Sequence, residues 1–355
     1  MIINPKQLSE KLAILCSATG LGNKRANVQA RPLGDILSVH VDGDDIQLVT
    51  KVKAVDYHNG CDPFAINGAA LRDVVTGMAG EKQIEMSLDG KGKLQLKAGK
   101  RRRGIGIEEY QRSDYHAPPV EGGFTVQAGD FESAIKNGGW CVNSSAAKLE
   151  FKGVSLKFTP GQLEVSSADN ARAVRSVVNA DVDAPASMLM PKKSAQVLMA
   201  IVKNAGSPLT GRVYQGKLLF ECGDWSGRIA LFASEMPNLD KMFHRPTIGE
   251  FTVDPVTFKA AVQSLASSAK AEGTKIKLKT LGDTLELSYA TATSDGVDHV
   301  QVHQHGTALE QSYIPRYLIQ ALDNVVQHVT IKYTDKGQLL FQTEKNESTQ
   351  TASMV

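Results

Sequence analysis

Three histidines close together in the sequence are the first candidates for chemistry. His299, His303 and His305 lie in the stretch HVQVHQH, and alternation along a strand would place all three on one face. Imidazole is a common zinc ligand, so a metal hydrolase is one hypothesis that this cluster raises. No cysteine or carboxylate stands at ligand spacing beside the histidines, and an exposed strand is the simpler interpretation.

A second candidate for chemistry is a phosphate-binding loop. Gly211–Leu218 (GRVYQGKL) contains the GxxxxGK pattern but lacks the next Ser or Thr, which would bind magnesium. This stretch is predicted to span a hairpin, whereas a phosphate-binding loop connects a strand to a helix. The sequence also contains no GxSxG, HExxH or SxxK pattern. We therefore expect no enzyme activity, no metal and no cofactor.

The composition is that of an ordinary globular protein, with 42% hydrophobic and 22% charged residues and a net charge of +2. The four cysteines form no CxxC pair, which argues against zinc ribbons and thioredoxin chemistry. No apolar run reaches the roughly 18 residues of a membrane helix, and there is no signal-peptide pattern. We expect a cytoplasmic protein with no membrane partner.

The elements that position these residues follow a threefold internal repeat. Phe251–Val262 (FTVDPVTFKAAV) is predicted to be a strand running into a helix, and it shares five of twelve positions with Phe124–Ile135 (FTVQAGDFESAI). Met1–Leu12 (MIINPKQLSEKL) aligns with both without a gap. Hairpin glycines recur at Gly92, Gly216 and Gly337. The repeat divides the chain into thirds, and we predict domains at residues 1–119, 120–246 and 247–355.

Each third is predicted to contain the order strand, helix, further strands two times, and therefore two helices. The predicted helices cover about Pro5–Ala18, Asn67–Ala79, Asp130–Gly138, Pro191–Asn204, the stretch that follows Phe251, and Pro315–Val326. In the middle third we predict strands at Leu149–Phe158 and Leu163–Val178, and a linker at Met236–Pro246. Alternating strands with hairpin turns indicate an α+β fold of antiparallel sheets with the helices on one face.

Positive charge recurs on the helices, directly opposite the apolar stripe on five of the six and beside it, at Arg72, on the other. The side chains in question are Lys6, Arg72, Lys136, Lys192, Lys203, Lys270 and Arg316. A solvated polar face explains one such helix, since every amphipathic helix needs a polar side. Six helices on one side of their sheets would instead form a broad, mildly basic surface suited to a phosphate backbone. The alternative is a non-enzymatic structural or assembly protein built from three repeats.

The ordered set of repeats and local motifs resembles the bacterial DNA polymerase sliding clamp, the beta-subunit processivity factor, in a phage or otherwise divergent form. Ala69–Gly80 with the hairpin IEMSLDGKGKLQLKAG resembles the family's first domain. Leu189–Lys193 (LMPKK) resembles its apolar–Pro–Arg–Lys helix start, and Met236–Leu239 (MPNL) resembles the segment that closes its second domain. The resemblance covers nearly the whole chain.

The resemblance implies a head-to-tail homodimeric ring of six clamp domains, with helices lining a hole that encircles duplex DNA. It implies that a basic loop with Lys24 and Arg25 contacts DNA. Together with the basic helix faces, the expected DNA contacts are Lys24, Arg25, Arg72, Lys136, Lys192, Lys193, Lys203, Lys270 and Arg316. It also implies a groove between the second and third domains that binds short linear motifs of the polymerase and the clamp loader. The groove residues would be Phe151, Asp169, Arg172, Ala173, Pro237, Lys241, Met242, Tyr317, Leu339 and Met354.

The resemblance further implies that the outer strand of the first domain closes the ring against the third domain of a second subunit. That strand is Lys100–Ile107 (KRRRGIGI), with Arg101, Arg102, Arg103, Ile105 and Ile107 as interface residues. A solvated arginine run or a DNA-binding patch remains an alternative for this stretch. The interface is favoured because an exposed edge strand with two isoleucines would promote aggregation. Asp295 and Asp298 are candidate acidic partners.

Overall fold

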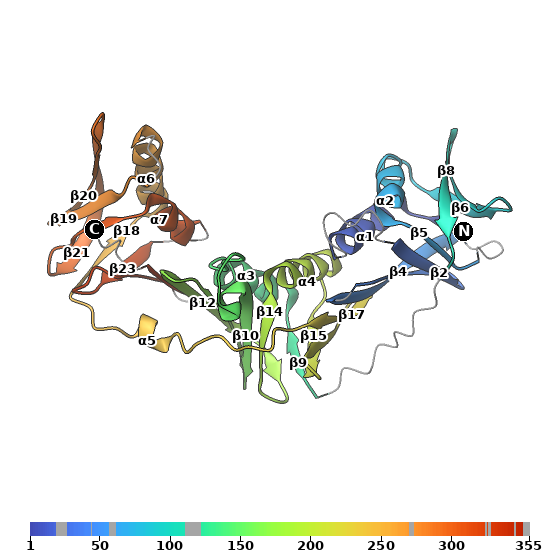
Figure 1. Cartoon of the computed structure of the whole chain (residues 1–355), viewed down its shortest axis with the longest axis horizontal. Helices are drawn as coiled ribbons and strands as arrows, with labels where there is room; N and C mark the ends of the chain where they lie inside the picture. Colours follow the sequence, from blue (N-terminus) through green and yellow to red (C-terminus); the bar gives the residue numbers. More distant parts are fainter. Residues whose placement is uncertain are drawn as a thin grey trace. The chain divides into compact units, whose positions relative to one another are not determined.

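The computed structural model describes residues 1–18, 27–43, 45–56, 62–110, 122–269, 273–323, 325 and 328–343, and the backbone of residues 346–350 (Figure 1). These residues form two compact units. The first unit comprises Met1–Glu132, Lys157–Leu163 and Asn179–Ala233, and the second comprises Ser133–Leu156, Glu164–Val178 and Ser234–Val355. The middle third of the sequence therefore contributes to both units.

Six helices lie where the sequence predicts them. They are α1 (Pro5–Ala18), α2 (Gly68–Thr76), α3 (Ala128–Gly138), α4 (Lys192–Ala205), α6 (Pro255–Ala269) and α7 (Pro315–Leu322). Side-chain caps fix several of their starts. Asn4 Oδ1 accepts hydrogen bonds from the backbone N–H groups of Lys6 and Gln7, at 3.0 and 3.2 Å, and Asn67 Oδ1 accepts one from Ala70 at 2.9 Å. No helix of the described residues is both long and apolar enough to cross a membrane.

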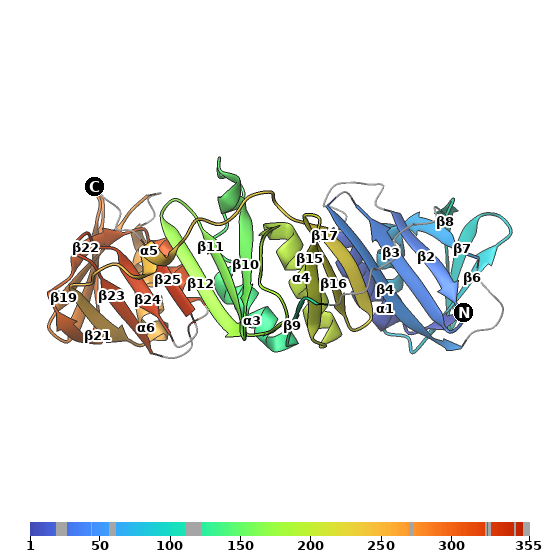
Figure 2. The ribbon, with the colours of Figure 1, turned by 90° about the horizontal axis from the view of Figure 1, so that it is seen from below.

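The strands of the first unit form one antiparallel sheet (Figure 2). In sheet order they are β1 (Ile2–Ile3), β6 (Ile84–Asp89), β7 (Lys93–Ala98), β8 (Arg101–Glu108), β5 (Phe64–Asn67), β2 (Asn27–Leu33), β3 (Ile36–Asp42), β4 (Ile46–Asp56), β17 (Trp225–Ala230), β16 (Lys217–Cys222), β15 (Leu209–Tyr214), β9 (Phe124–Val126) and β13 (Asp181–Val182). β1 pairs with β4 as well as with β6. The strands listed from β1 through β4 in this sheet order therefore form a closed ring of paired strands.

The strands of the second unit form another antiparallel sheet. In order they are β10 (Gly153–Thr159), β11 (Gln162–Ala168), β12 (Arg172–Asn179), β25 (Asn346–Gln350), β24 (Leu339–Gln342), β23 (Val329–Tyr333), β18 (Gly249–Val253), β21 (Asp295–Gly306), β20 (Thr284–Ala290), β19 (Ile276–Leu281) and β22 (Glu310–Tyr313). A further strand, β14 (Ala186–Pro191), leads into α4. The predicted α+β class with antiparallel sheets is confirmed.

Three predictions about the local structure of the middle third are wrong. The predicted strand Leu163–Val178 is two strands, because Asp169 and the next two residues form a turn that separates β11 from β12. The predicted strand Leu149–Phe158 starts only at Gly153, since Leu149–Lys152 form a 3-10 helix, η1. The predicted linker Met236–Pro246 contains a short helix, α5 (Asp240–Phe243).

The core of the second unit lies between the sheet and the apolar stripes of α6 and α7. Phe258, Val262 and Leu265 of α6 are buried in it, because their spacing of i, i+4 and i+7 places them on one face of the helix. Phe258 contacts Phe251 of β18 edge to face, with ring centroids 6.4 Å apart. Burying each of these large side chains contributes about 2 kcal/mol. The strand-into-helix repeat thus folds its helix back onto its own strand.

Two strand pairs join consecutive repeats. In the first unit β4 pairs with β17, from Ile46 opposite Ile229 to Thr50 opposite Trp225. In the second unit β12 pairs with β25, from Arg172 opposite Gln350 to Ser176 opposite Asn346. We call these pairs the first and the second junction. Each unit is therefore built around one junction between repeats.

Candidate functional site

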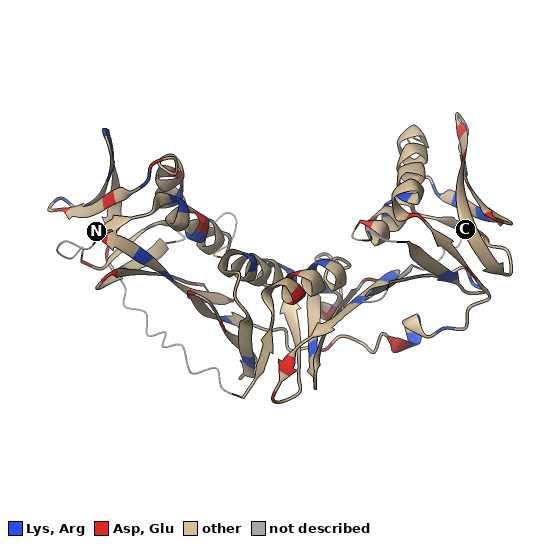
Figure 3. Ribbon diagram, turned by 180° about the vertical axis from the view of Figure 1, so that it is seen from behind, with Lys and Arg blue, Asp and Glu red and all other residues tan. Residues whose placement is uncertain are grey.

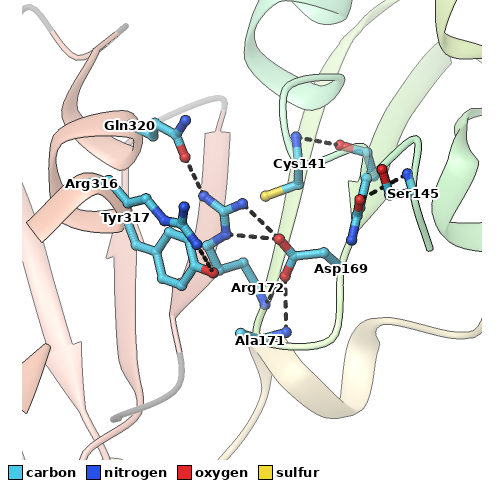
Figure 4. Close-up of polar contacts among 10 residues, drawn as sticks. Cys141, Ser145, Asp169, Ala171, Arg172, Arg316, Tyr317 and Gln320 are labelled. Atoms are coloured by element: carbon cyan, nitrogen blue, oxygen red, sulfur yellow. Dashed lines mark hydrogen bonds and ion pairs between the residues drawn. The ribbon is translucent and has the colours of Figure 1, made fainter. Parts of the chain in front are cut away.

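Two residues predicted to bind a partner, Asp169 and Arg172, meet at the turn between β11 and β12 (Figure 4). Asp169 Oδ1 accepts hydrogen bonds from the backbone N–H groups of Ala171 and Arg172, at 2.9 and 2.8 Å. Its Oδ2 accepts from Arg172 Nε and Nη2, at 3.0 and 2.6 Å. Both side chains are only 11% exposed. This charge-assisted pairing fixes the direction of the guanidinium group.

Trp140, which follows α3, and residues of α7 enclose the Arg172 guanidinium. Its central carbon lies 3.9 Å from the ring centroid of Tyr317 and 5.4 Å from that of Trp140. Arg172 Nη1 also donates a hydrogen bond to Gln320 Oε1. A planar guanidinium can stack flat on a ring and donate hydrogen bonds from several nitrogens at fixed angles, whereas a lysine has no such planar fork. We call Trp140, Asp169, Arg172, Tyr317 and Gln320 the arginine cluster.

A second cation approaches the arginine cluster from α7. Arg316 is exposed, its Nη2 donates to the Tyr317 hydroxyl at 3.2 Å, and its guanidinium carbon lies 4.9 Å from the Tyr317 ring centroid. Arg316 was predicted to contact DNA, and the structure places it against a residue predicted to bind a partner. The rim of the arginine cluster is therefore positively charged.

An apolar cluster begins one residue further along β12. Its buried members are Ala168, Ala173, Phe243 and Leu340, and its partly exposed members are Phe151, Met236, Leu239 and Met242. Side chains alternate along a strand, so Ala173 points to the opposite face of β12 from Arg172. Partly exposed methionine and phenylalanine side chains are adaptable and often receive apolar anchors of a peptide.

The helix α5 is fixed to the sheet beside this apolar cluster. Gln338 Nε2 donates to the carbonyl oxygen of Met242 at 3.0 Å. Arg175 Nη1 lies 2.8 Å from Asp240 Oδ1, and its guanidinium carbon lies 4.6 Å from the Phe243 ring centroid. The stretch predicted as a linker therefore supplies part of the site.

The structure brings most of the predicted partner-binding residues into these two clusters. Asp169, Arg172 and Tyr317 are in the arginine cluster, whereas Phe151, Ala173 and Met242 are in the apolar cluster. Pro237, which precedes α5, and Lys241, which lies in α5, are exposed. Leu339 is buried in the main core instead, and its strand neighbour Leu340 is the member of the apolar cluster. Met354 lies outside the described residues.

Sequence reasoning missed Trp140 and Gln320 of the arginine cluster, and Ala168, Met236, Leu239, Phe243 and Leu340 of the apolar cluster. Trp140 follows a helix, and nothing in its surroundings in the sequence points to Arg172. Gln320 is an exposed polar residue of α7 that lies 148 residues from Arg172 in the sequence, so no local pattern connects the two. Phe243 had a usable signal, because Met242 and Phe243 form an apolar pair in an otherwise polar stretch.

The other candidates for chemistry are set apart from these clusters. Among the described residues no three His, Cys, Asp or Glu side chains are grouped so that they could hold a metal ion. His299 Nε2 lies 3.8 Å from Glu286 Oε2 on the exposed face of β21. Burial raises the pKa of the Cys141 thiol far above its ordinary value, because a thiolate would be poorly solvated there. These residues lend no support to the metal-hydrolase hypothesis.

The helices carry the predicted cations in unequal environments (Figure 3). Lys6, Lys136, Lys193 and Lys203 are exposed, while Arg72 and Lys192 are half-buried. Some of this charge is matched locally, since Arg72 lies 2.9 Å from Asp73 and Lys203 lies 3.7 Å from Glu132. Of the remaining predicted DNA contacts, Lys24, Arg25 and Lys270 lie outside the described residues.

Among the strands that the structure describes, β8 and β21 each have one edge that lacks a partner along part of its length. β8 pairs with β7 along Arg101–Gly106, and only Ile107 and Glu108 also pair with β5 on the other edge. β21 pairs with β20 along Asp295–Gln301, and its pairing with β18 starts only at Val302. The predicted interface residues Arg101, Arg102, Arg103 and Ile105 lie on the open part of β8.

Comparison with known proteins gives one consistent likeness. No protein-family model matches the sequence. A curated protein named beta sliding clamp, from Rickettsia bellii, is 21% identical over 301 residues, which are 81% of this chain and 78% of that protein. At 21% identity this likeness is remote.

Solved structures of the same kind match the whole chain. The DNA polymerase III beta subunit of Thermotoga maritima superposes with a TM-score of 0.90 at 14% identity, covering 100% of this chain and 99% of that one. The beta subunit of Pseudomonas aeruginosa gives 0.87 at 15% identity, with complete coverage of both chains. The Caulobacter crescentus beta sliding clamp, solved with polyethylene glycol at its proposed beta-motif tethering region, gives 0.84 at 16% identity over 100% and 99% of the chains. The chain thus has the sliding-clamp fold.

Proposed function

We propose that this chain, which has the fold of the bacterial beta sliding clamp, is itself a DNA sliding clamp that tethers a replicative polymerase as a processivity factor. The observation that carries the proposal is the recurrence of one strand junction between repeats. β4 pairs with β17 and β12 pairs with β25 in the same antiparallel way. β21 is the counterpart of β4 and β12 in the third repeat, and β8 is the counterpart of β17 and β25 in the first. Part of one edge of each of these two strands remains open.

Two open edges of complementary kind support a ring. If β8 of one copy pairs with β21 of a second, the same junction repeats head to tail and the open edges of these two strands are covered. We propose a homodimer of six clamp domains, with domain boundaries at residues 1–119, 120–246 and 247–355. The apolar Val297, which is 56% exposed on β21, would be covered in such a ring.

The helices would line the hole of the ring and contact the phosphate backbone. Contacts by Lys6, Lys193 and the other exposed helix cations are independent of base sequence, which allows sliding. Partial neutralisation by Asp73 and Glu132 keeps each contact weak. Encirclement holds the DNA topologically, so no catalytic residue, metal or cofactor is needed, and the protein acts as a tether in the cytoplasm where the replication machinery works.

The partner site is proposed to be the two clusters at the start of β12. The partly exposed side chains of the apolar cluster would bind apolar residues of a short linear motif in the polymerase and in the clamp loader. Arg172 and Arg316, stacked on Tyr317, would bind polar or acidic groups of the same motif. The proposed beta-motif tethering region of the Caulobacter crescentus clamp is consistent with such a site.

The topological part of this proposal is tested by loading the protein on nicked circular DNA and then linearising the DNA. We expect retention on the circle and rapid loss from linear ends, because only encirclement is released by a free end. Equal retention on both forms would rule out encirclement. The alternative, a structural three-repeat protein, would not be retained on either form.

The DNA-facing surface is tested separately by the salt dependence of DNA binding. Replacing Lys192, Lys193 and Lys203 of α4 with alanine should reduce the slope of log K against log salt by about 0.9 for each phosphate that the variant no longer neutralises. The matched control replaces the exposed Lys51, Lys53 and Lys157, which lie on strands, with alanine. An equal change in slope for both triple variants would mean that α4 has no special role.

A further inference from the structure

Three turns that precede β4, β12 and β21 have the same hydrogen bond. The backbone N–H of Gly43 donates to the carbonyl of Ile46 at 2.9 Å, and that of Asp169 donates to the carbonyl of Arg172 at 2.9 Å. The N–H of Thr291 donates in the same way to the carbonyl of Ser294, at 2.8 Å. This turn defines equivalent positions in the three repeats, which are Ile46, Arg172 and Ser294.

The hairpin glycines define a second set of equivalent positions, which lie on β8, β17 and β25. Gly92, Gly216 and Gly337 all have positive φ, at 76°, 70° and 71°. The carbonyls of Gly92 and Gly216 accept from the N–H groups of Ile107 and Leu231, at 3.1 and 3.0 Å. Positions equally spaced from these glycines are Ile105 on β8, Ile229 on β17 and Gln350 on β25.

Both junctions within the chain pair these two sets of positions. Ile46 lies opposite Ile229 in the first junction, and Arg172 lies opposite Gln350 in the second. Two independent junctions thus have one register, although their sequences differ. The positions that have no partner in this scheme are Ser294 before β21 and Ile105 on β8.

We propose that β21 of one copy pairs with β8 of a second copy in this same register. Ser294 would lie opposite Ile105, and the pairs that follow are Asp295 with Gly104, Gly296 with Arg103, Val297 with Arg102, and Asp298 with Arg101. The proposal rests on the proposed function for the existence of the dimer, and adds to it which residue faces which.

The orientation of the side chains agrees with this register. Arg101 lies opposite the buried Ala98 on β7, so it points to the core side of its sheet. Asp298 lies opposite the buried Leu287 on β20 and also points to the core side. Residues directly opposite in a sheet share a face, and a slip of one residue would place every pair on mismatched faces.

Charge and size agree as well. The register pairs the acidic Asp298 with the basic Arg101, whose Nη1 already donates to the Gly77 carbonyl at the end of α2, 3.1 Å away. Two other charged side chains of the register each face a glycine, which leaves room for them: Arg103 faces Gly296, and Asp295 faces Gly104. The exposed Val297 would lie under the aliphatic part of Arg102.

Pairwise cysteine substitution tests the register. Directly opposite residues have Cα atoms about 4.5–5.5 Å apart, within the range of a disulfide, whereas diagonal neighbours are about 7–8 Å apart. Oxidation of Arg102→Cys/Val297→Cys, or of Arg101→Cys/Asp298→Cys, should give a covalent dimer on a non-reducing gel. Adjacent pairs alternate between the narrow and wide type, so at least one of the two variants has the more favourable geometry.

The controls are each single cysteine variant and the shifted pair Arg102→Cys/Asp295→Cys, which should stay monomeric on the gel. Cross-linking of the shifted pair in place of the two opposite pairs would overturn the register. A cross-linked dimer that is not retained on circular DNA would leave the register standing and refute the clamp function. If sedimentation shows a dimer but the cross-links form in another register, the proposed register is refuted and the clamp function still stands.

A charge exchange tests the Asp298–Arg101 pair without a disulfide. Arg101→Asp alone or Asp298→Arg alone should weaken the dimer roughly tenfold, because each ring then has two like-charge pairs. Arg101→Asp/Asp298→Arg in one chain should restore the affinity. Arg103→Asp/Asp298→Arg is the matched control, since Arg103 faces a glycine in this register. Rescue by the control instead of the predicted pair would overturn the assignment.

Discussion

Replacing Arg172 with alanine should destabilise the second unit more than any other single change in the site. The side chain of Arg172 is only 11% exposed, and it binds Asp169 through two nitrogens and Gln320 through a third. Its loss would leave the Asp169 carboxylate, also 11% exposed, without a counter-charge. Breaking a buried pair in this way costs about 3–5 kcal/mol.

Two features of the site place the expected loss at the lower end of that range. Asp169 Oδ1 keeps its two backbone N–H donors at the turn, so the carboxylate remains partly stabilised. The stacking of Arg172 on Tyr317 is worth about 1–2 kcal/mol but does not add fully to the ion pair. We expect a loss of about 3 kcal/mol for Arg172→Ala. Arg172→Lys keeps the charge but loses the planar fork, and should cost about half as much.

The assay uses the two tryptophans of the chain, one in each unit. In a Trp225→Phe background the fluorescence of Trp140, 5.4 Å from the Arg172 guanidinium, reports urea unfolding of the second unit. Arg316→Ala is the control, because Arg316 is exposed and touches only the rim of the cluster; its cost should stay below about 1 kcal/mol. Equal midpoint shifts for Arg172→Ala and Arg316→Ala would refute the view that the buried pair organises the site.

Three further predictions concern single side chains elsewhere. Lys11 is 4% exposed, but the carboxylate of Asp224, 2.9 Å from its ammonium, is 59% exposed and stays solvated when the lysine is removed. Lys11→Met, which keeps the buried stem, should therefore cost little in urea unfolding, whereas Lys11→Ala should cost about 2–3 kcal/mol. Burial lowers the pKa of His40; the unfolded chain therefore binds its proton more readily, and stability should fall as the pH drops below about 6.5, less steeply in His40→Gln. Burial raises the pKa of Cys222 to about 11, so at pH 8 iodoacetamide should modify Cys222 far more slowly than a free thiol, as mass spectrometry would record.

The helices and the strand-into-helix repeat could be predicted from the sequence because their signals are local. Asn4 and Pro5 mark the start of α1, and the apolar spacing fixes its buried face. The turn at Asp169 was missed, although Asp-Asn is a typical turn pair, because the apolar residues on both sides suggested one long strand. The helix η1 was missed for the same reason, since Leu149 and Phe151 resemble strand residues.

The composition of the site could be predicted only in part. Asp169, Arg172 and Tyr317 were identified through a family resemblance, and their contacts depend on the pairing of β12 with β25, which no local pattern encodes. The exchange of Leu339 for Leu340 has a simple cause: a strand alternates its faces, so an error of one residue moves a side chain from the site to the core.

The division of the middle repeat between two units has a consequence for how the chain can fold and be cut. A fragment that ends near residue 119 would keep β4 but lose β17, leaving Ile46–Thr50 as a bare strand edge. Such an edge pairs readily with other chains, so the fragment should aggregate or swap strands despite its complete helices. During synthesis, too, β4 must wait for residues of the next repeat before its hydrogen bonds are complete. The cooperative folding unit is therefore a junction with the parts of two repeats on either side, and proteolysis within the intact first unit should be resisted on both sides of β17.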